Sequence, residues 1–187
     1  MRNDVVMQIR RAVVADALGI AELHVKSWQV GYLGLIPQTY LDGLEPQQRL
    51  LRWQTSTEEA SWPDRGVLVA EDDGGVIVGF ANLCPTRDPD ARADTGVGVG
   101  AGSIGEITSF YVLPSTWRQG IGRRLMTASV EMLAYAGYAE ATLWVTEGND
   151  RAIDFYSALG WVPDGAVKDD VVAGAAIRDL RYRHALR

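Results

Sequence analysis

The residues best suited to do chemistry lie in the segment Trp117-Arg118-Gln119-Gly120-Ile121-Gly122-Arg123. It falls where a predicted strand ends and a predicted helix begins. Glycines at such a turn let a ligand approach the backbone closely, and the free amides of a first helical turn favour a bound anion. Arg118, Arg123 and Arg124 add positive charge to a chain whose formal net charge is −6. The segment predicts a site for a phosphate or pyrophosphate, with a glycine-rich turn bearing solvated arginines as the alternative.

This turn matches neither of two common phosphate-binding motifs. It lacks the G-x-G-x-x-G fingerprint with an acidic residue on a strand end about 20 residues later. The Gly-Lys-Ser/Thr of a P-loop is also missing. The glycines at positions 96, 98, 100 and 102 imitate a cofactor loop, yet they precede a predicted strand and open no helix. They are therefore interpreted as loop residues.

The elements around the turn alternate between strand and helix. Residues 104–113 have the pattern of a strand ended by Pro114, and residues 120–136 that of an amphipathic helix closed by Gly137. A strand over 141–146, a helix over 149–159 and a final strand over 176–183 follow. This order predicts an α/β architecture with at least one parallel strand pair.

The first half of the chain supplies further strands and helices. Hydrophobic periodicity predicts a strand over 7–13 and a helix over 16–31. Pro37 and Pro46 open short helices over 38–44 and 47–54, interpreted as a helical insert spanning 37–57. Strands over 66–71 and 76–83 flank Asp72-Asp73-Gly74-Gly75, which suits a hairpin turn. Residues 85–104 lack periodicity and predict a mobile loop.

Length and composition limit the class of protein. The 187 residues, 47% of them hydrophobic, indicate one domain over 1–187 that needs no disulfide or metal staple. No segment approaches the roughly 20 apolar residues of a membrane helix, and the net negative charge argues against a broad nucleic-acid surface. With Cys84 as the single cysteine and two histidines, an internal disulfide and a Cys/His zinc cluster are excluded. The first seven residues lack the apolar run of a signal peptide, so a cytoplasmic location is expected.

Three motifs, in this order, make the chain resemble the GNAT N-acetyltransferase superfamily. They are Glu106-Ile-Thr-Ser-Phe-Tyr-Val-Leu-Pro, Arg118-Gln-Gly-Ile-Gly-Arg and Asn149-Asp-Arg-Ala-Ile-Asp-Phe-Tyr-Ser-Ala-Leu-Gly-Trp. The resemblance covers residues 7–184 and implies a mixed, mostly antiparallel twisted sheet, flanked by helices, whose central parallel strand pair is splayed for coenzyme A. The chain departs from the family's pattern at Trp117, where Gln or Arg is usual. That departure affects one side-chain contact and leaves the backbone amides in place.

The resemblance implies acetyl-CoA as co-substrate and no metal. The pyrophosphate would bind the turn formed by Arg118, Gln119, Gly120, Ile121, Gly122 and Arg123. The pantetheine arm would run beside Phe110, Tyr111 and Val112. Asn149 resembles the family's cofactor-contacting asparagine, although a helix N-cap would explain this residue equally.

The resemblance also implies roles in catalysis. Tyr156 matches the tyrosine that protonates the leaving thiolate, with a merely packed, hydrogen-bonded tyrosine as the alternative. Glu106 looks like the general base of histone-type members, with a solvated strand-end glutamate or a salt-bridge partner as the alternative. The amide of Val112 would polarise the acetyl carbonyl.

His24, Trp28 and Tyr32 form one stripe of the first predicted helix, at i, i+4 and i+8. Such a stripe usually packs in a core. If it borders the acceptor cleft with Trp53 or Trp62, it would shape an amine pocket in which His24 is a substitute base.

These expectations combine into an N-acetyltransferase that moves an acetyl group from acetyl-CoA to a primary amine by direct attack in a ternary complex. The acceptor is a small-molecule or peptide amine, and the net negative charge mildly favours a cationic one. A non-catalytic acyl-CoA sensor and a nucleotide-binding enzyme are the alternatives. No nucleic-acid or membrane partner is expected. A homodimer through the exposed final strand is common among family members and stays open for this chain.

Overall fold

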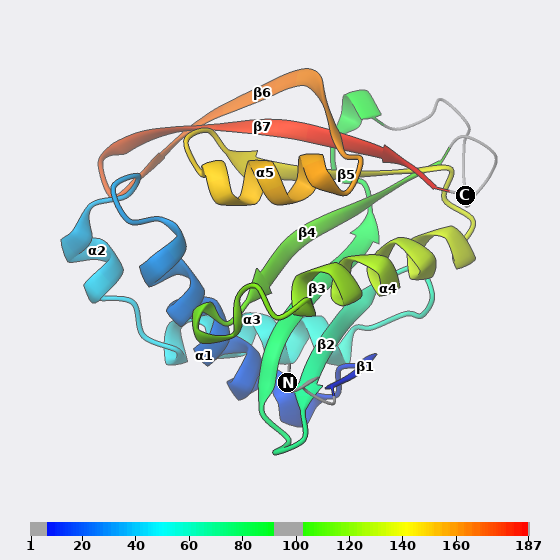
Figure 1. Cartoon of the computed structure of the whole chain (residues 1–187), viewed down its shortest axis with the longest axis horizontal. Coiled ribbons are helices and arrows are strands. Elements are labelled where there is room, and N and C mark those ends of the chain that lie inside the picture. The colour runs from blue at the N-terminus through cyan, green and yellow to red at the C-terminus, as the bar shows by residue number, and fades with distance from the viewer. Residues whose placement is uncertain (1–6, 92–102, 187) are drawn as a thin grey trace.

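The computed structural model describes residues 7–91 and 103–186, in which seven strands form one open sheet (Figure 1). The strand order is β1-β2-β3-β4-β5-β7-β6, and every neighbouring pair is antiparallel except β4 and β5. This arrangement confirms the expected fold class. The strands are β1 Met7–Arg11, β2 Gly66–Asp72, β3 Ile77–Pro85, β4 Ile104–Val112, β5 Glu140–Thr146, β6 Val162–Val172 and β7 Ala175–Ala185.

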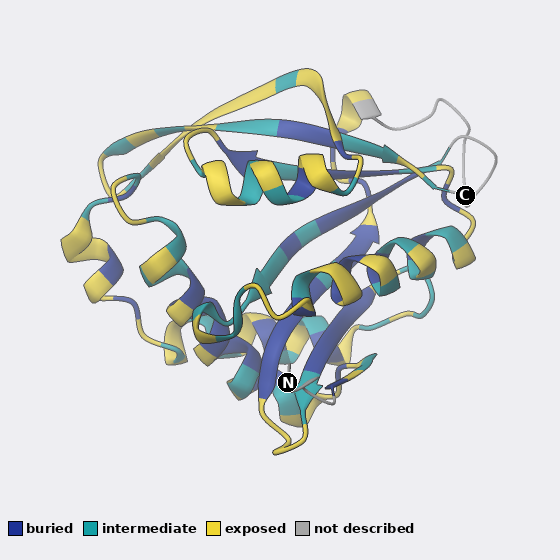
Figure 2. Ribbon diagram, in the orientation of Figure 1, coloured by how far each residue is buried: buried dark blue, intermediate teal, exposed yellow. Residues whose placement is uncertain are grey.

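Helices cover the sheet on both faces (Figure 1). They are α1 Ala17–Gly31, α2 Gln38–Asp42, α3 Gln47–Glu58, α4 Ile121–Tyr135 and α5 Asp150–Ala158, with short 3-10 turns at Val14–Asp16, Pro89–Ala91 and Pro114–Thr116. On one face, α1 and α3 bury Ile20 and Trp53 against Phe80. On the other face, α4 and α5 pack around Leu125 and Leu143. Figure 2 shows the result: β2, β3 and much of β4 are buried between the two layers.

The β2–β3 hairpin confirms the turn expected at Asp72-Asp73-Gly74-Gly75. The Oδ1 atom of Asp72 accepts hydrogen bonds from the amides of Gly74 and Val76, each at 2.9 Å. Gly75 has φ +77, in the left-handed region that glycine adopts without strain. A local motif is thus sufficient to set this connection.

The parallel strands β4 and β5 pair only at their beginnings. Ile104–Ile107 of β4 lie opposite Glu140–Leu143 of β5, and beyond these residues the two strands part. The amide of Leu113 donates to the Val78 carbonyl of β3 at 2.9 Å. Because successive residues of a strand point their amides in opposite directions, the amides of Phe110 and Val112 face the side from which β5 has parted.

A β-bulge in β4 changes which side chains reach each face of the sheet. Asn82 of β3 lies opposite Ser109, whereas Leu83 lies opposite Ile107, so Thr108 is an extra residue. The alternation of β4 side chains between the two faces of the sheet therefore shifts by one residue at this point. Ile107 and Phe110 pack towards α4 and α5, while Glu106, Ser109 and Tyr111 share the face that carries α1 and α3.

The C-terminal region corrects the expectation of one exposed final strand. Residues 162–185 form a hairpin, and β7 lies between β5 and β6. The edge strand at this end of the sheet is β6, which the periodicity did not predict. In the expected loop 85–104, β3 extends to Pro85 and a 3-10 turn covers Pro89–Ala91, while residues 92–102 lie outside the described part of the chain. None of the described helices is long and apolar enough to cross a membrane.

Candidate functional site

The turn before α4 presents a row of unoccupied backbone amides. Arg118 has φ +65 and Gly120 has φ +83, and α4 begins at Ile121. No group of the described residues accepts a hydrogen bond from the amides of residues 118–123, and the first helical bond runs from the Arg124 amide to the Gly120 carbonyl at 3.1 Å. Consecutive free amides at the N-terminus of a long helix are the arrangement that binds phosphate groups.

Two neighbours fix the position of this turn. A methyl group at Gly122 would lie 3.2 Å from the Phe155 ring, so glycine lets the first turn of α4 approach α5 closely. The indole N–H of Trp117 donates to the Val112 carbonyl at 2.8 Å, and the Arg151 guanidinium stacks 3.8 Å from the centre of the same indole ring. Trp117 thereby ties this turn to the end of β4.

Tyr156 lies on α5 beside the parting of β4 and β5. Its side chain is 7% exposed, and its ring packs edge-on to Phe110 with 6.3 Å between the ring centres. Burial, with a smaller contribution from Tyr111, raises the pKa of this phenol, so that it stays protonated at neutral pH. Within the described residues no hydrogen bond holds its hydroxyl group. The phenol is therefore free to donate its proton to a ligand.

Tyr111 and Tyr32 bring two further phenols near Tyr156. The Tyr111 hydroxyl accepts a hydrogen bond from Trp28 Nε1 at 2.9 Å. Burial raises the pKa of Tyr32, and the nearby phenols of Tyr111 and Tyr156 raise it further. Tyr32, predicted to border an acceptor pocket, thus lies near the predicted acid, and Trp28 packs on Tyr32 with ring centres 4.7 Å apart. Tyr111, predicted to contact the cofactor, directs its phenol to the acceptor face.

His24 is held in the core. It is 2% exposed, its ring stacks on Tyr111 with centres 4.9 Å apart, and its Nδ1 accepts a hydrogen bond from Trp53 Nε1 at 3.2 Å. Burial lowers its pKa to about 3, with smaller contributions from Arg49 and Arg52. A neutral imidazole whose Nδ1 accepts a hydrogen bond carries its proton on Nε2. This arrangement leaves His24 no free lone pair with which to act as the substitute base.

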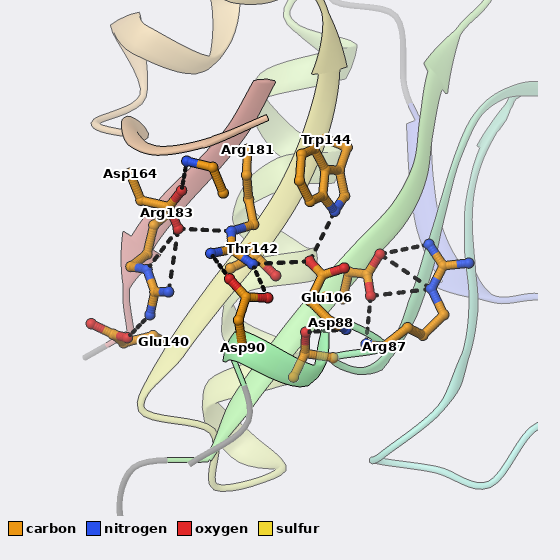
Figure 3. Close-up of polar contacts among 12 residues, drawn as sticks. Arg87, Asp88, Asp90, Glu106, Glu140, Thr142, Trp144, Asp164, Arg181 and Arg183 are labelled. Atoms are coloured by element: carbon orange, nitrogen blue, oxygen red, sulfur yellow. Dashed lines mark hydrogen bonds and ion pairs between the residues drawn. The ribbon is translucent and has the colours of Figure 1, made fainter. Parts of the chain in front are cut away.

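Glu106 forms an ion pair at the wall of this site (Figure 3). It is 1% exposed, and Arg87 donates from Nη2 to Oε1 at 2.6 Å and from its backbone amide to Oε2 at 2.9 Å. Asn149 is similarly engaged, because its Oδ1 caps α5 by accepting from the Ala152 amide at 3.4 Å. For both residues, the structure shows the structural contact that the sequence offered as the alternative to a functional role.

A buried arginine holds the segment around Arg87 against the sheet. Arg181 of β7 donates to Asp88 at 3.3 Å, to Asp90 at 2.8 Å and to Asp164 at 2.8 Å (Figure 3). Trp144 of β5 adds an indole N–H bond of 2.9 Å to Asp88. This network lies next to the Glu106 pair and fixes its surroundings.

Sequence reasoning missed two arginines on α3. The Arg49 guanidinium lies 5.1 Å from the centre of the Trp28 ring, and that of Arg52 lies 4.9 Å from the Trp53 ring. Arg52 Nη2 also lies 3.5 Å from the Ser109 hydroxyl of β4. The available signal was two cationic residues three positions apart in the segment interpreted as an insert. The described residues contain no cluster of three or more His, Cys, Asp or Glu side chains that would hold a metal ion.

Comparisons of sequence agree on a family. The model of the acetyltransferase (GNAT) family matches residues 23–161. The uncharacterized N-acetyltransferase YuaI of Bacillus subtilis is 31% identical over 173 residues, which cover 92% of this chain and 89% of that relative.

Solved structures share the fold. YncA from Salmonella typhimurium, solved with its cofactor acetyl-CoA, has a TM-score of 0.68 at 22% identity and covers 97% of this chain and 95% of its own. The PaiA N-acetyltransferase from Thermoplasma acidophilum, in complex with coenzyme A, has a TM-score of 0.67 at 18% identity, with 96% and 99% covered.

Proposed function

Because the chain belongs to the acetyltransferase (GNAT) family, we propose that it transfers the acetyl group of acetyl-CoA to a primary amine by direct attack in a ternary complex. One observation carries the proposal. The free amides of residues 118–123 open next to the parting of β4 and β5, where the unbonded hydroxyl of Tyr156 lies. This arrangement supports an anion site and a proton donor along the path of one extended thioester.

The cofactor would be held mainly by backbone groups. The amides of residues 118–123 suit the pyrophosphate, and the exposed side chains of Arg118 and Arg123 add positive charge there. The amides of Phe110 and Val112, which β5 does not engage, suit the amide groups of the pantetheine arm and the acetyl carbonyl oxygen. A backbone N–H aimed at that oxygen stabilises the negative charge that develops on it.

In the reaction a bond forms between the amine nitrogen and the acetyl carbon, and the bond between that carbon and sulfur breaks. Tyr156 gives its proton to the leaving sulfur, and its raised pKa keeps the phenol protonated at neutral pH until then. The amine loses one proton, which we assign to Glu106 through a water molecule, since Glu106 lies on the acceptor face of β4. The ion pair with Arg87 is the competing, purely structural role of Glu106.

The substitution Tyr156→Phe tests the proposed acid. We expect kcat for acetyl transfer, followed as thiol release from acetyl-CoA, to fall at least tenfold, because the sulfur then leaves without a proton. The Kd for coenzyme A, measured by calorimetry, should stay within twofold. Tyr135→Phe is the matched control, because Tyr135 is 78% exposed on the far part of α4. An active wild type whose kcat Tyr156→Phe leaves unchanged would refute the role.

Comparing Glu106→Gln with Arg87→Gln tests whether Glu106 acts as the base or only as the ion-pair partner of Arg87. If Glu106 takes the proton, Glu106→Gln lowers kcat at least tenfold while Arg87→Gln retains most of it. Equal losses of kcat in the two variants, with equal losses of thermal stability, would assign Glu106 a structural role. If the wild type binds acetyl-CoA but releases no thiol with any amine, the result would instead support the acyl-CoA sensor. The ion pair that occupies the Glu106 carboxylate favours this alternative.

A further inference from the structure

Arg49 and Arg52 place two uncompensated positive charges on the acceptor face. They lie three residues apart on α3, stacked on Trp28 and Trp53 respectively. No carboxylate of the described residues forms an ion pair with either one. By contrast, Arg87 and Arg181 each have a carboxylate partner.

This placement costs stability in the absence of a ligand. Like charges three or four residues apart on a helix repel each other. Burial lowers the pKa of Arg52, and the nearby charges of Arg49 and Arg87 lower it further. An anion bound between the two guanidinium groups would remove this repulsion. Arg52 is exposed and Arg49 is half-buried, so both guanidinium groups are open to such a ligand.

The subsite lies one side chain away from the proposed reaction centre. Arg52 reaches Ser109, and Tyr111, two residues further along β4, contributes to the electrostatic environment of both Arg52 and Tyr156. A ligand that bridges the arginines and the acetyl group is consequently short.

We propose that the acceptor is a small amine that also carries a carboxylate, such as an amino acid, and that Arg49 and Arg52 bind this carboxylate while the amine faces Tyr156. The inference rests on the proposed acetyl transfer and names its substrate class. Planar guanidinium groups match the two oxygens of a carboxylate. The local charge thus points away from the cationic acceptor that the net charge of the chain mildly favours.

A hollow elsewhere in the described part of the chain favours the opposite chemistry and supplies the competing outcome. It has a volume of about 480 Å³, lies between the loop after α1 and the β6–β7 hairpin, and is lined by Glu147, Asp169, Asp170 and Arg178 among others. Asp169 is paired with Arg178, which leaves Glu147 and Asp170 to attract a cation. A diamine acceptor would use this hollow and ignore the arginines.

The test compares amino acids with their carboxamides, which keep the amine and remove the negative charge, and adds linear diamines. In the wild type we expect kcat/KM to be at least tenfold higher for an amino acid than for its carboxamide. Arg52→Gln and Arg49→Gln should each raise KM for the amino acid at least tenfold and leave KM for the carboxamide within twofold. Arg65→Gln, at an exposed arginine outside the site, should change neither.

The two substrates serve as internal controls for folding, since a misfolded variant loses activity on both. Preference for carboxamides or diamines, or equal losses on amino acid and carboxamide, would overturn the inference and leave acetyl transfer standing. Absence of thiol release with every amine of the panel, while acetyl-CoA still binds, would refute the proposed function itself.

Discussion

Hydrogen bonding separates the residues that can react from those that hold the site. The Tyr156 hydroxyl is unbonded within the described residues, whereas His24 Nδ1 accepts from Trp53. Glu106 and Asn149 are engaged by Arg87 and by the Ala152 amide. Among the four, Tyr156 is thus the residue whose polar group is least committed to the protein.

His24 should make the stability of the protein depend on pH below neutrality. Its folded pKa is about 3, whereas the unfolded value is near 6.5, so as pH falls the unfolded chain takes up a proton that the folded chain refuses. The free energy of unfolding should therefore fall by about 2 kcal/mol between pH 7 and pH 5 from this residue alone. Urea denaturation at the two pH values measures it.

His24→Gln is the control, since glutamine keeps an acceptor for Trp53 and does not titrate. Over the same pH interval, the free energy of unfolding of the variant should fall by about 2 kcal/mol less than that of the wild type. Equal pH dependence in the two proteins would show that the folded state accepts the proton, and would contradict the buried, neutral imidazole.

The sequence predicted the positions of those candidate site residues that belong to a local motif. Gly120 and Tyr156 belong to short segments in which turn and helix spacing already set position. Arg49 and Arg52 were missed because their proximity to Ser109 depends on how α3 packs against β4. The phenol of Tyr111 was expected beside the cofactor, and the bulge at Thr108, which turns it to the other face, leaves no clear signal in the sequence.

Among the elements, the turn into α4 has the central role in the proposed function. Its amides are free because Gly120 takes a left-handed conformation just before the helix begins. The helix then contributes its N-terminal partial positive charge to the same point. A change in the backbone here should therefore act on ligand binding in addition to stability.

Gly120→Ala should separate these two effects when compared with Gly165→Ala. Both glycines have nearly the same φ, +83 and +89, and nothing lies within 4 Å of a methyl group added at either one. Each substitution should lower the free energy of unfolding by about 1 kcal/mol, because alanine is strained at positive φ. We expect only Gly120→Ala to weaken coenzyme A binding, by about tenfold in a calorimetric Kd. Equal Kd values for the two variants would argue against the turn as the binding site.

The strand β6 shows where sequence patterning fails for an element. Nearly all of its residues are exposed, so no buried face imposes an alternation of polar and apolar side chains. It also contains Pro163 and Gly165, which weaken a strand signal. Pairing with β7 creates this strand, and such tertiary pairing cannot be read from local sequence. Its charged residues Lys168, Asp169 and Asp170 also disfavour pairing of this edge with another chain.

In the molecule as a whole, the two halves of the sheet meet at β4 and β5 and then part. The apolar layer under α4 and α5 contains residues of both strands, whereas the layer under α1 and α3 contains Tyr111 of β4 and no residue of β5. The alternation of strands and helices predicted the parallel strand pair. That the two strands part was predicted from the family resemblance and not from the spacing of residues.

The most direct test of the account is a ¹⁵N NMR titration of the full chain with acetyl-CoA. The account predicts that the amide resonances of residues 118–123, and those of Phe110 and Val112, shift more than any others, because these amides gain the ligand as their hydrogen-bond acceptor. Binding that leaves these resonances in place while amides elsewhere shift would contradict it.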